Sequence, residues 1–560
     1  MSNRVQLDTT SSFVGGLNLR ADQLKIGDNQ SPWLLNMDVD EAFGARSRRG
    51  WDIRTGYSAS GGESVDPRNM YSHTAPNGTE TTFLASGGNI YTSSGGAPFV
   101  RAAAGAVNVF CAAAPHGADF VSWNAEVYVA CGGSLVSQSW DGGVWTALTD
   151  AHGNWANDYT VPGSVSMMPK AELAASQHGY LWCANTTEGG THHANRLRFS
   201  HPNDPDKWAY LDFIDFPEGD GPITGIIPFR DHLLVFFADS VWALYGTNLA
   251  TFSKANVSET IGAANRQCLT RSEQDIFFVS WPYGVYSIGP ESIREVSANL
   301  RPSMKMSGNF SSDVSLQWLS YVNQKLFWSV PFHEDGAPDA PTTVFTYDPL
   351  IGAWSLWRAA DGSAIGPVAG SPSSSTPLAA IRPTTTPLGG QSAEFWEFDA
   401  KETPIDGVSS AFETVLRTPW ADSGYPTVKK RWRRPDLIIR DSDFPYTLDM
   451  HVYHNLDETA ARRTLSVSFV PKSSAAFWFT DPAWDGTDDS LLNPTAGQSW
   501  NDYTYSVPPS LWGTSAKGSS IERSAGLGNA SSVQVEFHGE PGKKWGVNAI
   551  IWKSIMRRIR

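Results

Sequence analysis

The sequence predicts an all-β protein: a β-propeller of about six or seven blades, preceded by an extended N-terminal arm and followed by a C-terminal β-sandwich domain. The first observation behind this prediction is the turn content. The 560 residues include 50 Gly and 35 Pro, placed between short runs of aromatic and β-branched residues, as is typical of strands. The second is periodicity, because pairs of such runs joined by a polar or Gly turn recur about every 40 to 60 residues, the length of a four-stranded blade.

Three sections follow one another along the chain. Residues 1–68 are expected to form the arm and the propeller entry, residues 69–410 the propeller, and residues 411–560 a β-sandwich or platform-like domain. Each paired run in the middle section is interpreted as an antiparallel hairpin, and radial stacking would cover the faces that a small sheet cannot bury alone. A set of stacked β-sandwiches is the alternative. Beyond Ser410 the alternating strands are longer, and the acidic stretch Thr480–Ser506 is interpreted as an interaction loop or an ordered surface excursion.

Composition indicates a folded, acidic chain. Hydrophobic residues make up 41% and aromatic residues 12%, with 23 Trp, whereas disordered chains are poor in such residues. The formal charge of −15 argues against a protein that holds nucleic acid through its net field, and leaves local basic patches open. The cysteines are scattered without a CxxC pair, so buried free thiols are expected rather than a zinc site or a disulfide framework. They are Cys111, Cys131, Cys183 and Cys268.

No targeting or membrane segment is predicted. The start, MSNRVQLDTTSS, lacks the apolar core of a secretory signal, which predicts synthesis and folding in the cytosol. The longest weakly polar run, Ala102–Ala114, is rich in Ala and shorter than the roughly 20 apolar residues that span a bilayer.

The sequence offers no catalytic signature. GxSxG, Walker and HExxH motifs are absent. The stretch SWDGGVW, Ser139–Trp145, approaches the Asp-box of sialidases, but it occurs once and an Asp-Gly hairpin turn explains the same residues. Possible metal ligands occur at Thr191–His193 and Phe332–Gly336, where turn residues are the simpler interpretation because adjacent histidines on a strand point to opposite faces. We therefore expect no enzyme activity, no cofactor and no metal.

Basic residues gather in two places. The segment KKRWRRPD, Lys429–Asp436, leads into a strand, and we interpret it as a solvated sheet edge or a salt-bridged interface, with contact to nucleic acid phosphates as the alternative. A group of arginines precedes Trp51. The C-terminal KSIMRRIR is interpreted as a polar tail, with a docking tail as the alternative. The residues predicted to serve an interface or docking are Arg46, Arg48, Arg49, Lys429, Lys430, Arg431, Arg433 and Arg434.

The opening stretch, Phe13–Trp51, resembles the N-terminal segment of tailed-phage tail nozzle proteins, the tail tubular protein B-like β-propellers. The similarity lies in the order of a Gly-Gly-Leu-Asn, a polar Gly-Asp-Asn-Gln-Ser, a Leu-Asn and an Arg-x-Gly. Further elements follow in family order over about two thirds of the chain. The matching elements are Gly15–Asn18, Gly27–Ser31, Leu35–Asn36, Arg48–Gly50, Asn195–Trp208, Gly221–Gly246, Gly262–Gly289 and Val344–Trp357.

This resemblance implies a virion structural protein, made in the bacterial host cytoplasm, that forms a hexameric ring below the adaptor or head-to-tail connector. Such a ring lines and closes the DNA exit channel, connects to tail fibre or tail tip proteins, and passes double-stranded DNA without sequence-specific binding. A related minor tail protein of a long-tailed phage is a neighbouring possibility. Six copies at −15 each would carry −90, and an acidic channel wall would let DNA slide.

A function of another class stays open: a carbohydrate-active or glycan-binding tail protein, such as a propeller glycoside hydrolase. It would need convergent carboxylates in an axial pocket, or exposed Trp side chains as stacking platforms.

The opening stretch itself is interpreted as an extended arm over Val14–Leu35, with a short turn or helix around Ala21–Ile26. If the arm mediates assembly, removal of Met1–Asp38 would leave a folded monomer that cannot form rings.

Overall fold

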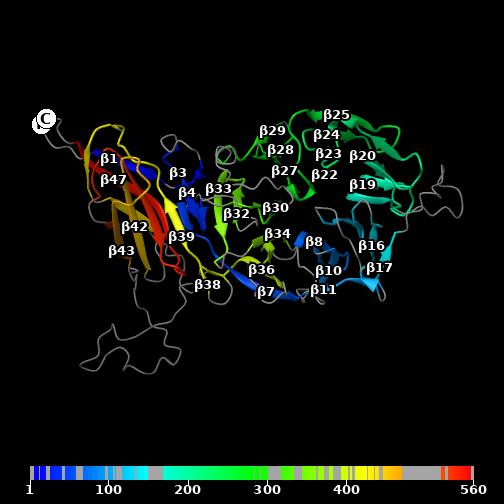
Figure 1. Ribbon diagram of the computed structural model, residues 1–560, viewed down its shortest axis with the longest axis horizontal. Coiled ribbons are helices and arrows are strands. Elements are labelled where there is room, and N and C mark those ends of the chain that lie inside the picture. Colours follow the sequence, from blue (N-terminus) through cyan, green and yellow to red (C-terminus); the bar gives the residue numbers. More distant parts are fainter. Residues whose placement is uncertain are drawn as a thin grey trace, which may run out of the picture.

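Seven blades of four antiparallel strands form a ring in the computed structural model, within the part of the chain that the structure describes (Figure 1). Six blades are separate sheets, and the sixth blade along the chain belongs to a larger sheet of nine strands. The predicted all-β propeller is therefore confirmed. In the described residues the helices are two short 3-10 segments, η3 (Glu218–Asp220) and η4 (Arg266–Cys268).

The structure describes residues 6–556 except for 12, 20–25, 41–43, 59–66, 87, 95–98, 105–106, 109–116, 133–134, 149–167, 283, 291, 301–316, 333–342, 361–363, 371–376, 383–391, 402–403, 407–409, 426, 434, 441–445, 470–518 and 524–526. The predicted loop Thr480–Ser506 lies outside these residues, as does most of the turn or helix predicted around Ala21–Ile26.

The blades are numbered 1 to 7 here in chain order. Blade 1 comprises β8 (Pro67–Thr74), β9 (Glu80–Ser86), β10 (Asn89–Ser94) and β11 (Val100–Arg101); blade 2, β14 (Asp119–Trp123), β15 (Glu126–Ala130), β16 (Gln138–Trp140) and β17 (Trp145–Ala147); blade 3, β18 (Lys170–Gln177), β19 (Tyr180–Glu188), β20 (Thr191–Phe199) and β21 (Phe213–Asp215); blade 4, β22 (Gly225–Phe229), β23 (His232–Phe236), β24 (Val241–Tyr245) and β25 (Ser253–Ser258). Blade 5 comprises β26 (Leu269–Arg271), β27 (Ile276–Ser280), β28 (Gly284–Ile288) and β29 (Ile293–Glu295); blade 6, β30 (Trp318–Val322), β31 (Lys325–Val330), β32 (Thr343–Asp348) and β33 (Ala353–Arg358); blade 7, β34 (Ala364–Gly370), β35 (Pro377–Arg382), β36 (Ser392–Lys401) and β7 (Gly50–Ser58). Short two-stranded pairs are formed by β12 (Ala103–Ala104) with β13 (Val107–Asn108) and by β37 (Ile405–Asp406) with β38 (Ser410–Ala411).

The first strand of each blade lies on the inner side of the ring. β8 lies beside β14, β14 beside β18, β18 beside β22, β26 beside β30, β30 beside β34, and β34 returns to β8. The ring is closed by the start of the chain, because β7 pairs antiparallel with β36 as the outer strand of blade 7. A strand from the N-terminal section thus completes a sheet whose other strands lie more than 300 residues later.

Large aromatic side chains fill the spaces between blades. Phe236 and Phe278 pack with ring centroids 5.2 Å apart between blades 4 and 5, and Trp51 lies 6.4 Å from Trp357 between blades 7 and 6. Burial of such side chains against the neighbouring blade is what stabilises small sheets that are stacked radially. The fully buried Trp side chains are Trp51, Trp208, Trp328, Trp354, Trp357, Trp432, Trp545 and Trp552.

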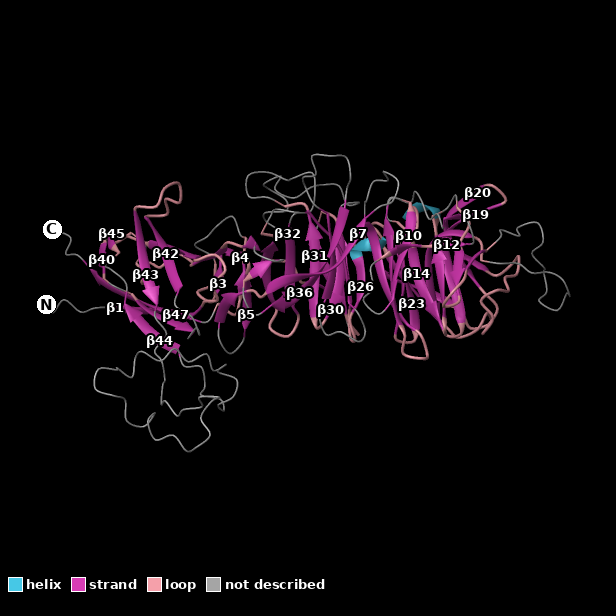
Figure 2. Cartoon of the chain, turned by 90° about the horizontal axis from the view of Figure 1, so that it is seen from below, coloured by secondary structure: helices cyan, strands magenta, loops and turns pink. Residues whose placement is uncertain are grey.

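A second body, formed by two packed sheets, lies at the other end of the molecule (Figures 1 and 2). Leu437, Val547 and Ile550 from one sheet share a buried core with Met450 and Phe537 from the other, as in a β-sandwich. The first sheet holds β44 (Ser519–Arg523), β41 (Asp436–Arg440), β47 (Gly546–Met556), β40 (Lys430–Trp432) and β45 (Gly528–Ala530), with β1 (Gln6–Ser11), β5 (Met37–Asp40) and β6 (Gly44–Ser47) attached; the second holds β39 (Thr414–Arg417), β46 (Val533–Gly539), β42 (Tyr446–His454) and β43 (Arg463–Phe469).

The opening stretch joins the two bodies. β4 (Trp33–Leu35) pairs in parallel with β33 of blade 6 and antiparallel with β39 of the sandwich, so one sheet of nine strands runs from the propeller into the sandwich. The stretch is extended, as predicted, but it is packed into the protein rather than free. Phe13, Leu17 and Leu34 are fully buried. Removal of Met1–Asp38 would therefore take away core residues, which corrects the expectation of a folded monomer.

Candidate functional site

Four segments of the opening stretch contact one another in the joint between propeller and sandwich. β2 (Gly16–Leu17) and β3 (Gln30–Ser31) pair in parallel. The Asn18 side chain donates to Gln30 Oε1 at 2.7 Å, so the Gly-Gly-Leu-Asn element holds the Gly-Asp-Asn-Gln-Ser element. Gly16 has a φ of +65°, and a Cβ there would lie 2.6 Å from the carbonyl oxygen of Trp354. Glycine is required at this position because the backbone passes directly against blade 6.

The other two elements of the opening stretch meet at Arg48. Arg48 Nε donates to Asn36 Oδ1 at 3.0 Å, which joins the Arg-x-Gly element to the Leu-Asn element. The two terminal nitrogens of Arg48 donate to the two carboxylate oxygens of Asp406 at 2.9 and 2.7 Å. The guanidinium lies 4.1 Å from the Trp51 ring centroid and 3.6 Å from that of Phe412. Bidentate pairing and stacking of this kind hold a buried guanidinium in one orientation.

The three arginines predicted for docking therefore differ in their surroundings. Arg48 is buried and fully engaged within the chain. Arg46 is half-buried, 3.6 Å from Asp40, and Arg49 is exposed. Of the three arginines, only Arg46 and Arg49 therefore remain candidates for docking.

The basic segment near residue 430 lies inside a sheet and not at its edge. β40 has β47 on one side and β45 on the other, so the interpretation as an edge strand was wrong, because pairing on both sides depends on strands far along the chain. Lys430 is buried, and its Nζ donates to the carbonyl oxygens of Val428 at 3.1 Å and Ser531 at 2.8 Å. Burial lowers the pKa of Lys430.

Exposed cations remain on the outer face of this segment. Lys429, Arg431 and Arg433 are exposed, while Arg434 lies outside the described residues. Trp432 is buried and packs against Trp552 with ring centroids 6.2 Å apart, so it is not a platform for a stacked base. Alternation along the strand thus places Lys430 and Trp432 inward and Arg431 outward. An interface here would use the three exposed cations.

Charge is distributed unequally between the two bodies. Residues 411–560 contain 18 Lys and Arg against 16 Asp and Glu, a formal charge of +2. Because the whole chain carries −15, residues 1–410 carry −17. The acidic character of the chain therefore belongs to the propeller and the N-terminal section. Electrostatic repulsion of a polyanion would act on that part of the chain alone.

An ion pair joins the inner strand of blade 2 to the entry of blade 5. Arg266, in η4 at the entry to blade 5, donates through Nε to Asp119 Oδ2 at 3.1 Å, and Asp119 begins the inner strand of blade 2. Blades 2 and 5 lie on opposite sides of the ring. Burial raises the pKa of Asp119, and the Arg266 guanidinium opposes that rise. Asp119 also accepts a hydrogen bond from the Ala174 amide at 3.0 Å, so this carboxylate joins blade 2 to blade 3 and to the entry of blade 5.

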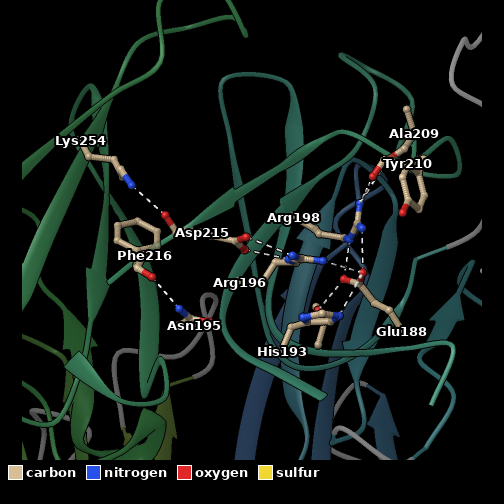
Figure 3. A network of polar contacts seen from close by, with 11 residues as sticks. Glu188, His193, Asn195, Arg196, Arg198, Ala209, Tyr210, Asp215, Phe216 and Lys254 are labelled. Atoms are coloured by element: carbon tan, nitrogen blue, oxygen red, sulfur yellow. Dashed lines mark hydrogen bonds and ion pairs between the residues drawn. The ribbon is translucent and has the colours of Figure 1, made fainter. Parts of the chain in front are cut away.

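A polar network connects the strands of blade 3 (Figure 3). Arg198 is buried and donates to both oxygens of Glu188, at 2.5 and 2.7 Å. Arg196 bridges Glu188 at 3.2 Å and Asp215 at 2.8 Å. Burial raises the pKa of Glu188, but the hydrogen bond and the charge of Arg198 more than offset this and the net pKa is lowered. The network ties β19, β20 and β21 together.

The candidate catalytic clusters lie on a turn and on strands where the structure describes them. Asp141 in Ser139–Trp145 accepts hydrogen bonds from the amides of Gly143 and Val144 at 3.0 and 2.7 Å, which confirms the hairpin turn. Thr191–His193 lies on strand β20, so the interpretation as turn residues was wrong; His193 Nε2 lies 3.9 Å from Glu188 Oε2. Of Phe332–Gly336, Phe332 is buried and the remaining residues lie outside the described part.

One cluster with metal-ligand geometry was missed by the sequence analysis. His451, Glu536 and His538 bring three ligand atoms within 4.8 Å of one another on the sandwich. The available signal was the alternation Glu-Phe-His, which places a carboxylate and an imidazole on one face of a strand. The third residue comes from a strand more than 80 residues earlier, and local sequence does not reveal that pairing.

The cysteines depart in part from expectation. Cys183 and Cys268 are buried free thiols, and burial raises the pKa of both. Cys131 is disulfide-bonded, whereas a free thiol was expected for each cysteine. Among the described residues, no helix has the length and apolar character needed to cross a membrane.

Comparison with known proteins identifies similarity of fold. The virginiamycin B lyase of Staphylococcus aureus, solved with quinupristin, is 8% identical over 61% of this chain and 98% of its own, with a TM-score of 0.37. The WD40 domain of Neurospora crassa Pan2 is 9% identical over 63% of this chain and 96% of its own, with a TM-score of 0.37. YCF48 of Cyanidioschyzon merolae is 10% identical over 62% and 98%, with a TM-score of 0.33. No family model and no curated protein matches the chain. The four-stranded blades of the described residues themselves make the chain a β-propeller protein.

Proposed function

We propose that the chain is a structural, non-enzymatic subunit of a phage tail, which assembles into a hexameric ring around the DNA exit channel and connects the adaptor to distal tail parts such as fibre or tip proteins. The proposal rests first on the resembling sequence elements. Those of the opening stretch meet at Asn18–Gln30 and Asn36–Arg48, in the joint between propeller and sandwich. The meeting of these elements in one joint supports the proposal.

The observation that carries the proposal is that propeller and sandwich form one continuous subunit whose two parts differ in net charge. The nine-stranded sheet makes the propeller and the sandwich a single elongated subunit (Figures 1 and 2). Its acidic part, residues 1–410, carries −17, and residues 411–560 carry +2. Acidic propellers facing a lumen would repel DNA phosphates, while the less acidic sandwiches could pack against neighbours without strong mutual repulsion.

The DNA path would run between subunits and not through the propeller. The Arg266–Asp119 ion pair joins residues of blades 2 and 5, which lie on opposite sides of the ring, so side chains from opposite blades meet inside the propeller. Head-to-tail contacts between identical subunits can close into a ring, and the hole enclosed by that ring of subunits would be wider than the inside of one propeller. The exposed cations Lys429, Arg431 and Arg433 are candidates for this contact, opposite acidic residues of the next subunit.

The glycan-active alternative has less support. Its sequence argument was the abundance of Trp, and in the part of the chain that the structure describes eight Trp side chains are fully buried. Among the described residues, the large hydrophobic side chains that are exposed do not include Trp. Asp119 is tied to Arg266, so it does not offer the free carboxylate pair that glycoside hydrolysis uses.

Negative-stain imaging and light scattering of the full-length chain test the proposal. A closed ring near six times 61.0 kDa is expected. Reversal of the three cations to Glu should abolish it, whereas the same reversal at the exposed propeller residues Arg230, Lys254 and Arg271 should not. A chain that stays monomeric at the highest attainable concentration, and that cleaves or binds polysaccharide, would overturn the proposal in favour of the alternative.

A further inference from the structure

A His-Glu-His cluster lies on the second sandwich sheet, on strands β42 and β46. His451 on β42 stands directly opposite Glu536 on β46 in the antiparallel register. His538 follows two residues after Glu536, so both side chains leave the same face of β46. Phe537 between them points into the buried core. Strand alternation and cross-strand pairing thus bring the three polar side chains together.

The contacts of the cluster match those of a metal site. The ligand atoms of the three residues lie within 4.8 Å of one another, and His538 Nε2 is 2.6 Å from Glu536 Oε1. Around a tetrahedral zinc ion with bonds of about 2.0–2.1 Å, ligand atoms are roughly 3.3 Å apart. Small side-chain rotations would therefore suffice to admit an ion among these atoms.

Two neighbouring residues already orient the ligands. His538 Nδ1 lies 3.0 Å from Glu413 Oε1, the arrangement in which a carboxylate orients a metal-binding imidazole. His538 Nε2 is hydrogen-bonded to Glu536 Oε1, so an ion would take the place of the proton between these two atoms. Arg417 contacts Glu536 Oε2, which leaves Oε1 toward His538. The His538 side chain is 26% exposed and that of Glu536 is 7% exposed, so an ion could enter from solvent while the carboxylate stays held.

We propose that His451, Glu536 and His538 bind a divalent transition-metal ion of the zinc class, with Glu413 as the supporting carboxylate. Two imidazoles and one carboxylate are a ligand set that suits zinc, and water would take the fourth position. The ion would link β42 to β46. Glu413, which directly precedes β39, would connect β39 to the site through its contact with His538. It would therefore stabilise the sandwich end of the subunit.

Cobalt titration of the tag-free, chelator-treated full chain tests the proposal. The wild type should bind one Co²⁺ per chain with the visible spectrum of a tetrahedral site, and Zn²⁺ should displace it. His451→Ala and His538→Ala should each weaken binding by at least about 100-fold, and Glu413→Gln by about 10–100-fold with the spectrum retained. His192→Ala, which alters an exposed histidine of blade 3, should bind as the wild type does.

Circular dichroism establishes that each variant is folded. If His538→Ala does not fold, His451→Ala carries the test, because its partly exposed ring is the least integrated of the three. Wild-type binding no stronger than that of His451→Ala would overturn the proposal, as would a Co²⁺ spectrum that is the same in both.

Discussion

Arg48 and Asp406, 358 positions apart in the chain, form a buried bidentate ion pair with nitrogen–oxygen distances of 2.9 and 2.7 Å. The pair ties the opening stretch to the segment that leaves the propeller for the sandwich. Asp406 also accepts hydrogen bonds from the backbone amides of Trp51 and Ala360, each at 3.1 Å. One carboxylate therefore holds the closing strand of blade 7, the end of blade 6 and the joint together.

Replacement of Arg48 by Met should destabilise the protein strongly. The change leaves the Asp406 carboxylate buried without its cation, and removal of one partner from a buried pair costs about 3–5 kcal/mol. Arg46→Met is the control, because Arg46 is half-buried and its ion pair with Asp40 is looser, at 3.6 Å; about 1 kcal/mol or less is expected there. Urea unfolding measures both, and equal midpoints for the two variants would contradict the assignment.

Deletion of residues 1–38 should prevent folding rather than assembly alone. The deletion removes β1 and β4, which pair with β47 and with β33 and β39, and it removes the buried side chains of Phe13 and Leu17. Deletion of residues 1–5 is the control, since β1 begins at Gln6. Soluble yield and circular dichroism are the measurements. A soluble, folded monomer from the longer deletion would restore the interpretation of the stretch as an assembly arm.

Replacement of Arg198 by Met should weaken blade 3 more than the same change at Arg196. Arg198 is 1% exposed and is the main partner of buried Glu188, whereas the Arg196 side chain is 15% exposed. We expect a cost of about 3–5 kcal/mol for Arg198→Met and about 1 kcal/mol for Arg196→Met. Thermal unfolding distinguishes the two. The reverse order would show that Arg196, and not Arg198, neutralises Glu188.

Local sequence was sufficient to predict the strands and hairpins, but not the pairing and contacts between strands that are far apart along the chain. Alternation and turn chemistry act over a few residues, so the hairpins and the Asp141 turn could be predicted. The pairing of β7 with β36, and the position of β40 inside its sheet, depend on strands far away along the chain. The same holds for Arg48 with Asp406 and for His451 with Glu536, because those contacts exist only once the topology is set.

Replacement of Asp212 by Asn should stabilise the protein at neutral pH. Asp212 precedes β21 and is 7% exposed, and burial raises its pKa from 3.8 to about 6. The folded state therefore holds the proton more tightly than the unfolded state does. The stabilising contribution of Asp212 is complete below the unfolded pKa of 3.8 and is lost as the pH rises through about 6.

Asn cannot ionise, so the Asn variant escapes this loss. Its melting temperature should exceed that of the wild type by a few degrees at about pH 7.5, and the difference should vanish at about pH 4. Asp215→Asn is the matched control, because Asp215 is exposed and pairs with Arg196 at 2.8 Å; its loss should lower the melting temperature at neutral pH. An Asp212→Asn variant less stable than the wild type at about pH 7.5 would mean that the ionised carboxylate is favourably solvated.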